Sequence, residues 1–309
     1  MNSRPLWIAV TVLICLLFSF NQVDAQQNKT PYQSKLQLKI ATNVSTIERH
    51  KINNKRDFCN ELAKQDNLDR AAVELLLICM SLKMEGVEAE LELIPSPTYG
   101  RAIQMLQDGK AHIAAQSLWA SDINPELIHL TEATIRLGEF EKGIYTTKNH
   151  PLQQQKGQHY PLNNYLGVTL RSWHHDWRIL NELTPSSIST IRYDSMIKML
   201  SVGRGDFTLH EFPNNDELVV RYSGVDLYPL QGVKIVIHDI RAFGISLKAP
   251  SSERLIHIMN NGVHKMREQG LIREIYENNG FINQQTNGWA ILNPIEKTDK
   301  SPNKAGALQ

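Results

Sequence analysis

Strand-like and helix-like apolar patterns alternate along the first third of this chain. Leu36, Leu38 and Ile40 alternate with polar residues, which is the period-two pattern of a half-buried strand. The pattern continues with a helical stripe at 71–86, an alternating strand at 89–93, a short helix at 99–106 and a buried strand at 112–118. This alternation predicts an α/β fold in which a parallel sheet carries helices on its faces. Residues 44–68 are polar and predict no regular element, and Pro95 is expected to end its strand because proline cannot donate to a ladder.

A second round of elements follows an extended segment at 135–146, which is long enough to cross between two lobes. The patterns predict strands at 166–170, 190–193, 207–210, 218–222, 232–237 and 242–247, and helices at 173–183, 194–202 and 255–270. Ligands of open α/β sheets bind outside the carboxyl ends of the strands. Asn43 and the segment 117–119, which follow two predicted strands, are therefore expected at a common ligand site.

Both ends of the chain differ from the part between them. Arg4 precedes an apolar run at 6–20, and small residues at 23–25 follow, so residues 1–25 are predicted to be a cleaved secretory signal peptide. A transmembrane anchor is the alternative, but the run is shorter than the ~20 residues that cross a bilayer. At the other end, residues 287–309 form a polar tail that is expected to be disordered.

Composition narrows the function. The formal net charge is +1, which provides no field for attracting nucleic acid or an anionic membrane surface. Two cysteines, Cys59 and Cys79, remain after the predicted signal peptide. In an oxidising compartment they could form one disulfide, and the alternative for Cys79 is a small apolar residue on a buried helix face.

Two motifs in the second half of the chain carry a resemblance to a known family. One is Leu200-x-x-Gly203-Arg204-x-Asp206, and the other is the stretch 266–276, with its Gly-x-x-x-x-Ile-Tyr ending. With the order of elements, they resemble the type II periplasmic solute-binding proteins, most closely those that serve amino-acid ABC transporters. The resemblance covers about residues 36–281.

The resemblance implies a two-lobed fold that closes on its ligand by a hinge. Each lobe would contain a mainly parallel sheet flanked by helices, and two crossing strands would join the lobes. Lobe 1 would comprise residues 26–140 and 240–286, and lobe 2 residues 141–239.

The same resemblance indicates ligand-binding residues. Glu211 matches the position where the family places an acid for the ligand's ammonium group, and the alternative is a solvated carboxylate before Pro213. Ser117, Trp119 and Ser121 match a first-lobe segment that binds the ligand's carboxylate. Trp119 could offer a flat face to a cation or be a core residue.

The arginine that clamps the carboxylate in this family is missing, since none occurs between the segment at 117–121 and Arg136. Arg171, Ser172 and Trp173 lie at a strand-to-helix turn where unpaired amides favour anions. We therefore expect Arg171 to replace the missing arginine. Potential metal ligands are His174, His175, Asp176, His210 and Glu211. No metal site is expected from them, because three or four would have to converge on the ion and adjacent histidines on a helix point in different directions.

Together these observations predict a monomeric periplasmic protein that captures a small polar, amino-acid-like or amine-bearing solute for an ABC-type transporter. The membrane permease or receptor would be another chain, and no cofactor or nucleic acid is expected. One alternative is a ligand-sensing partner of a membrane receptor. Another is a periplasmic dehydratase of the cyclohexadienyl type, in which Glu211 would be a general acid with a raised pKa.

Overall fold

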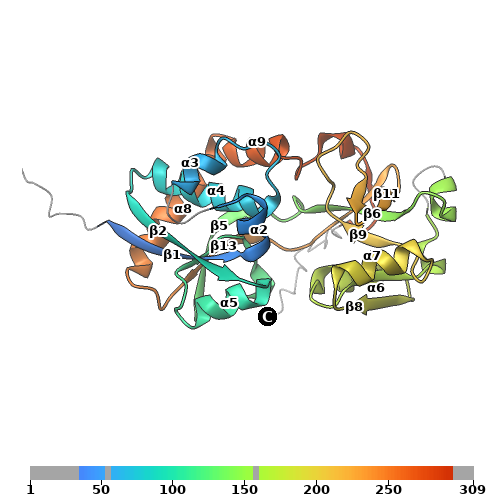
Figure 1. Ribbon diagram of the computed structural model, residues 1–309, viewed down its shortest axis with the longest axis horizontal. Helices are drawn as coiled ribbons and strands as arrows, with labels where there is room; N and C mark the ends of the chain where they lie inside the picture. The colour runs from blue at the N-terminus through green and yellow to red at the C-terminus, as the bar shows by residue number, and fades with distance from the viewer. Residues whose placement is uncertain (1–34, 53–56, 156–159, 295–309) are drawn as a thin grey trace, which may run out of the picture. The chain divides into compact units, whose positions relative to one another are not determined.

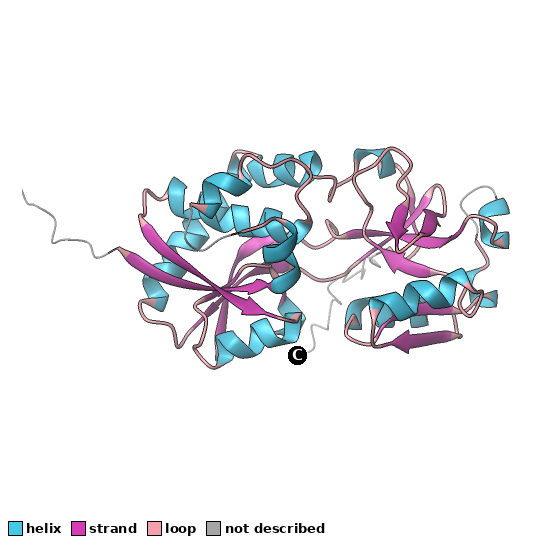
Figure 2. Ribbon diagram, in the orientation of Figure 1, coloured by secondary structure: helices cyan, strands magenta, loops and turns pink. Residues whose placement is uncertain are grey.

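The computed structural model describes residues 35–52, 57–155 and 160–294. The predicted signal peptide at 1–25 lies outside these residues, so its prediction is not tested. Within the described ranges no helix combines the length and the apolar character needed to span a bilayer. The described residues from Leu36 onward form one compact unit with two large sheets (Figures 1 and 2).

The first sheet has the strand order β2-β1-β3-β13-β4, with β5 paired to β13. Its strands are β1 (Leu36–Asn43), β2 (Ala89–Ser96), β3 (Ile113–Ala114), β4 (Leu118–Trp119), β5 (Ile128–Ile135) and β13 (Arg241–Ser246). Its helices are α2 (Val44–Arg49), α3 (Phe58–Leu62), α4 (Arg70–Met84), α5 (Tyr99–Gln107), α8 (Ser252–Glu268) and α9 (Leu271–Asn278). The strand β1 pairs in parallel with β2 and β3, whereas β13 returns antiparallel from a distant part of the chain.

The second sheet is built around β6 (Glu141–Thr147), which pairs antiparallel with β9, β11 and β12. The other strands are β9 (Thr208–His210), β10 (Val220–Tyr222), β11 (Val225–Pro229), β12 (Val233–Val236) and β14 (Ala290–Ile291). A parallel pair, β7 (Gly167–Leu170) and β8 (Ser187–Thr190), adjoins it with the helices α6 (His174–Leu183) and α7 (Tyr193–Ser201). Short 3-10 helices are η1 (Ala120–Asp122), η2 (Pro151–Gln154), η3 (Leu162–Asn164) and η4 (Gln284–Thr286).

Parallel pairing, which the alternation of elements predicted, occurs in β1–β2, β1–β3 and β7–β8, but β6 pairs antiparallel with its neighbours. The predicted irregular stretch 44–68 contains α2, which Asn43 caps, and α3. The strand β2 continues through Pro95 to Ser96 because it is an edge strand and needs no donor on its free side.

Three further predictions need correction. The strand expected at 112–118 is two short strands, β3 and β4, each paired with β13. The strand expected at 190–193 ends at Thr190, because Tyr193 begins α7. The expected disordered tail is ordered up to residue 294, since β14 pairs with β12 and Trp289 packs edge-on against Phe212.

Helix α4 is positioned by a cap, a covalent bond and close packing. Asp69 accepts a hydrogen bond from the backbone amide of Ala72, which satisfies one free donor of the first turn. A disulfide joins Cys59 of α3 to Cys79 of α4, whose Cα atoms are 5.8 Å apart. Helix α8 packs against α4, where a Cβ at Gly262 would lie only 2.6 Å from the Cα of Ser81. The cap fixes the start of α4 and the other two contacts hold its second half, so the helix that carries Arg70 and Glu74 is held at both ends.

Candidate functional site

An ion pair joins the two sheets where α4 begins and β9 ends. Arg70 is the first residue of α4, and Glu211 directly follows β9. The Nε atom of Arg70 donates to both carboxylate oxygens of Glu211 at 3.3 Å. Its guanidinium also lies over the rings of Phe140 and Phe281, at 5.6 and 5.8 Å from the ring centroids. Arg70 therefore sits in a site formed by a carboxylate and two aromatic faces, which is suited to a cation.

Glu74, one turn along α4, is fully buried. It is the centre of a polar network that is formed by Arg70, Glu74, Ser117, Glu211, Arg241 and Tyr276. Its two oxygens accept from Nη1 of Arg70 at 3.2 and 3.1 Å. They also accept from the backbone amide of Ser117 at 2.9 Å and its hydroxyl at 2.5 Å. Tyr276 donates its hydroxyl from α9 at 3.4 Å. A buried carboxylate needs this many partners because its desolvation is costly.

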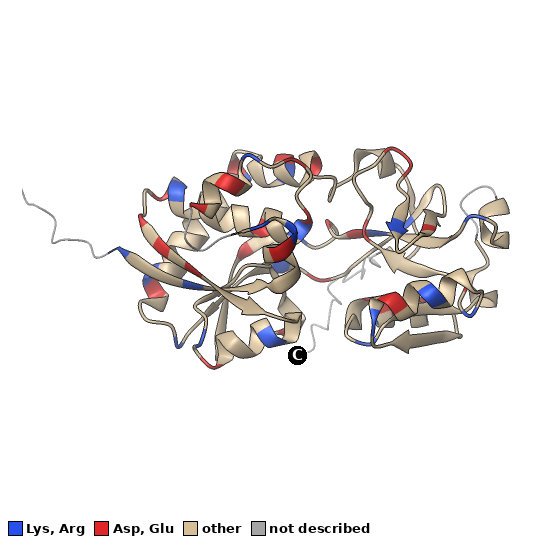
Figure 3. Ribbon diagram, viewed as in Figure 1, with Lys and Arg blue, Asp and Glu red and all other residues tan. Residues whose placement is uncertain are grey.

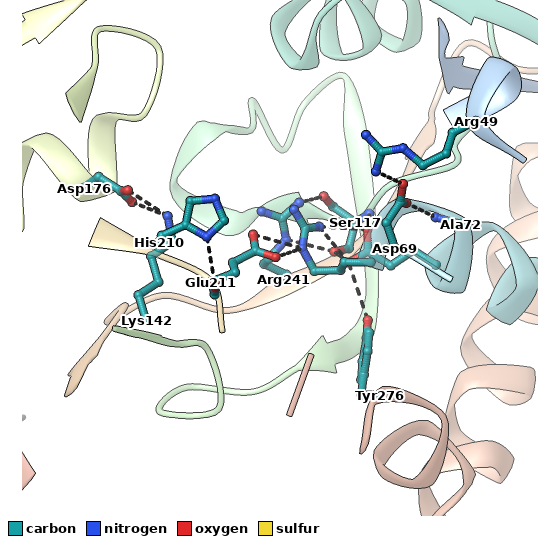
Figure 4. A network of polar contacts seen from close by, with 12 residues as sticks. Arg49, Asp69, Ala72, Ser117, Lys142, Asp176, His210, Glu211, Arg241 and Tyr276 are labelled. Carbon is teal, nitrogen blue, oxygen red and sulfur yellow. Dashed lines mark hydrogen bonds and ion pairs between the residues drawn. The ribbon is translucent and has the colours of Figure 1, made fainter. Parts of the chain in front are cut away.

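Arg241, the first residue of β13, is only 4% exposed and lies beside this network (Figure 4). Its Nε donates to the hydroxyl of Ser117 at 2.9 Å, and its Nη2 donates to the carbonyl of the same serine. The guanidinium stacks on Trp119, 4.5 Å from the ring centroid. Among the described residues it has no carboxylate within ion-pair distance, and its Nη1 makes no hydrogen bond. A buried cation without a counter-ion is unusual, because charged side chains are rarely buried unpaired.

The pKa values follow from these contacts. Burial alone would raise the pKa of Glu211, but the charges of Arg70 and Lys142 and the hydrogen bond from Arg70 lower it to about 2. Burial lowers the pKa of Arg241, and the neighbouring positive charge of Arg70 lowers it further. Glu211 is therefore ionised at neutral pH, whereas the charge on Arg241 is only partly compensated.

A second ion pair lies on the other side of Glu211. Nζ of Lys142, on β6, donates to both oxygens of Asp176 on α6 at 2.9 and 2.7 Å, and both side chains are buried. The same ammonium lies 4.7 Å from the ring centroid of Trp173. His210 is held by Tyr193, whose hydroxyl is 3.0 Å from its Nε2, and burial lowers the pKa of His210. Lys142 is thus neutralised by Asp176 and not by Glu211.

The structure brings several sequence-predicted residues together. Glu211, Ser117 and Trp119 all belong to the network, although Ser117 is fully buried and uses its hydroxyl and amide to hold Arg241 and Glu74. Trp119 is 9% exposed and offers its face to Arg241. Ser121 is exposed, and its hydroxyl lies 3.4 Å from Nε2 of His175 on α6.

Other predicted residues lie apart from the network. Asn43 caps α2, because its side-chain oxygen accepts from the amide and the hydroxyl of Ser45. Arg171 and Ser172 are exposed directly after β7, and their side chains make no hydrogen bond, ion pair or ring contact with the described network residues. Their role in binding stays a prediction.

Sequence reasoning did not identify Arg70, Glu74 or Arg241 as site residues. The sequence pattern does mark Glu74, because it is a charged residue within the buried stripe of α4 that includes Leu75 and Ile78. It also marks Arg241, since this charged residue directly precedes the fully buried run 242–246. A charge at a position predicted to be buried indicates a paired or functional group.

A hollow in the surface lies elsewhere, beside the disulfide. It has a volume of about 390 Å³ and is lined by Cys59, Cys79, Leu82 and Val87, among others. We place the candidate site at the network instead, because buried charges from both sheets converge there and not at the hollow. Within the described ranges no three histidine, cysteine or acidic side chains are grouped as metal ligands.

Comparisons with known proteins establish the fold. No protein-family model matches the chain, and no curated protein sequence does. Among solved structures, the GluR0 ligand-binding core in complex with L-glutamate has a TM-score of 0.53 at 12% identity, covering 80% of this chain and 98% of that one. The probable amino-acid ABC transporter extracellular-binding protein ytmK from Bacillus subtilis has a TM-score of 0.53 at 11% identity, with 80% and 99% covered.

A third similar structure is the BvgS periplasmic VFT2 domain from Bordetella pertussis, with a TM-score of 0.50 at 13% identity and 78% and 91% of the chains covered. These likenesses confirm the predicted fold class: the chain has the two-lobed α/β fold of type II periplasmic binding domains. The lobe boundaries near residues 140 and 240 remain a prediction.

Proposed function

We propose that this protein is a solute-binding protein that captures a small, amino-acid-like carboxylic acid between its two lobes. Arg241 carries the proposal: it is a buried guanidinium, held by Ser117 and stacked on Trp119, with no carboxylate partner among the described residues. A ligand carboxylate would supply the missing counter-ion and accept from Nη1. Charge-assisted hydrogen bonds of this kind are among the strongest in proteins.

The structural neighbours support the same class of ligand. One is described as a ligand-binding core with L-glutamate and another as a probable amino-acid ABC transporter extracellular-binding protein. We propose that the chain is exported to the periplasm by residues 1–25, acts as a monomer, and delivers its ligand to a permease or a receptor supplied by another chain. Mixed acidic and basic residues over both sheets support a small-molecule ligand over nucleic acid (Figure 3).

We do not propose an enzyme. In the dehydratase alternative Glu211 would donate a proton, which requires a raised pKa. The charges of Arg70 and Lys142 instead lower its pKa to about 2. A carboxyl group with this pKa holds almost no proton at neutral pH, which speaks against this chemistry.

The test is a binding screen followed by calorimetry. Small carboxylic acids, amino acids, sugars and polyamines are added to the mature protein, and an increase in melting temperature marks a ligand. Affinity for the best acid is then measured with Arg241→Gln, which should weaken binding at least about tenfold, because a hydrogen bond to a charged group contributes about 1.5–3 kcal/mol.

Arg171→Ala is the matched comparison, since Arg171 is exposed at the end of β7 and is the rival carboxylate residue. If Arg171→Ala loses acid binding and Arg241→Gln keeps it, then Arg171 and not Arg241 binds the ligand's carboxylate. A mature protein that binds none of the acids would contradict the proposed function.

A further inference from the structure

Arg70 lies where a ligand's ammonium group was expected. The motif resemblance predicts that Glu211 binds the ligand's ammonium group, yet both of its oxygens accept from Nε of Arg70 at 3.3 Å. Phe140 and Phe281 flank the same guanidinium, and Glu74 holds its Nη1. Cationic groups of ligands are recognised by carboxylates and aromatic faces in this way.

The remaining donors of the two arginines suit an anion. Nε and Nη1 of Arg70 are taken by Glu211 and Glu74, and Nε and Nη2 of Arg241 by Ser117. Neither Nη2 of Arg70 nor Nη1 of Arg241 donates to any residue that the structure describes. Both guanidiniums lie over Phe140, at 5.6 and 5.8 Å from its centroid, so the two arginines are close neighbours.

The carboxylate of Glu211 is already paired with a cation. Its partner Arg70 is shared with Glu74, and the nearby Lys142 donates to Asp176 at 2.7 Å. An ammonium group at Glu211 would lie beside the guanidinium of Arg70, which repels it and competes for the same two oxygens. A carboxylate at Arg241 meets no such competition.

We infer that Arg70 is a built-in substitute for a ligand ammonium group, and that the ligand is a carboxylic acid without an α-amino group. This inference rests on the proposed function and narrows its ligand class. The acid's carboxylate binds the free donors of Arg241 and Arg70, while Glu211 holds Arg70 in place and does not touch the ligand.

The experiment compares acids in pairs that differ only by the amino group: L-alanine with propionate, L-glutamate with glutarate, and L-phenylalanine with phenylpropionate. Calorimetry of the mature wild-type protein should give tighter binding of the deaminated member, by about tenfold or more, since the ammonium group of the amino acid competes with Arg70 for Glu211. Tighter binding of the amino acid would overturn the inference while supporting the proposed function. Absence of binding by both members of every pair would overturn both.

The variant Arg70→Gln removes the built-in cation and frees Glu211. In this variant the affinity for the amino acid, relative to that for the deaminated acid, should rise by about tenfold or more, because the ligand's ammonium can now pair with Glu211. Arg70→Lys is the matched control and should keep the wild-type preference, since it keeps a cation at the same place. An unchanged preference in folded Arg70→Gln would overturn the inference, and if this variant does not fold, the wild-type comparison decides alone.

Discussion

Replacing Glu74 by glutamine should destabilise the protein strongly, because this buried carboxylate links α4 to α9 and to Ser117, which directly precedes β4. It accepts from Ser117 at 2.9 and 2.5 Å, from Arg70 at 3.1 Å and from Tyr276 at 3.4 Å. In Glu74→Gln one oxygen becomes an amide nitrogen that faces donors, and Arg70 loses one of its two carboxylates. Breaking a buried ion pair costs about 3–5 kcal/mol, and the remaining pair with Glu211 places the loss near 3 kcal/mol.

Urea unfolding followed by tryptophan fluorescence measures this change in the free energy of unfolding. A loss of about 3 kcal/mol corresponds to a fall in melting temperature of about 6–12 °C, at about 2–4 °C for each kcal/mol. Glu268→Gln is the control, since Glu268 is exposed at the end of α8 and should change stability by less than about 0.5 kcal/mol. If the Glu74→Gln protein is as stable as this control, the stability of the protein does not depend on the contacts of Glu74.

Three further predictions concern stability. The pKa of Glu211 is lowered from 4.5 to about 2, so its contribution is fully present above pH 4.5 and is lost as the pH falls toward 2. Since the side chain is 31% exposed, urea unfolding at pH 5 and pH 2 should differ by about 1–2 kcal/mol from this group, and Glu211→Gln should remove that part. Replacing Cys59 and Cys79 by serine opens a loop with a sequence separation of 20 and should cost about 3 kcal/mol in urea, whereas equal midpoints would contradict this role. Gly262→Ala should lower the melting temperature by several degrees, about 1–3 kcal/mol, because its Cβ would lie 2.6 Å from the backbone of Ser81; an unchanged melting temperature would show that α8 shifts freely.

The fold could be predicted from periodicity because its main elements have one buried face. The alternation in 36–40 and the stripe of α4 both follow from burial. Short strands are harder to predict from the sequence, since β11 (Val225–Pro229) and β14 (Ala290–Ile291) have too few residues to show a period. Whether they form depends on neighbouring strands that are distant in sequence.

The candidate site could be predicted only in part. Glu211 directly follows β9, and Ser117 lies between β3 and β4, so their place at strand ends follows from the order of elements. Arg70 and Arg241 come from a helix start and a returning strand, 171 positions apart in the chain (241 minus 70), and only tertiary packing brings both beside Phe140. A carboxylate-binding arginine as distant in sequence as Arg241 could therefore not be found by searching the residues near 117–121.

A crystal structure of the protein with its tightest-binding acid would show whether Arg241 binds the ligand. We expect the ligand's carboxylate within hydrogen-bond distance of Nη1 of Arg241, between the two sheets, with Arg70 still paired to Glu211. A ligand bound in the hollow beside Cys59 and Cys79, or one whose carboxylate contacts neither arginine, would contradict this expectation.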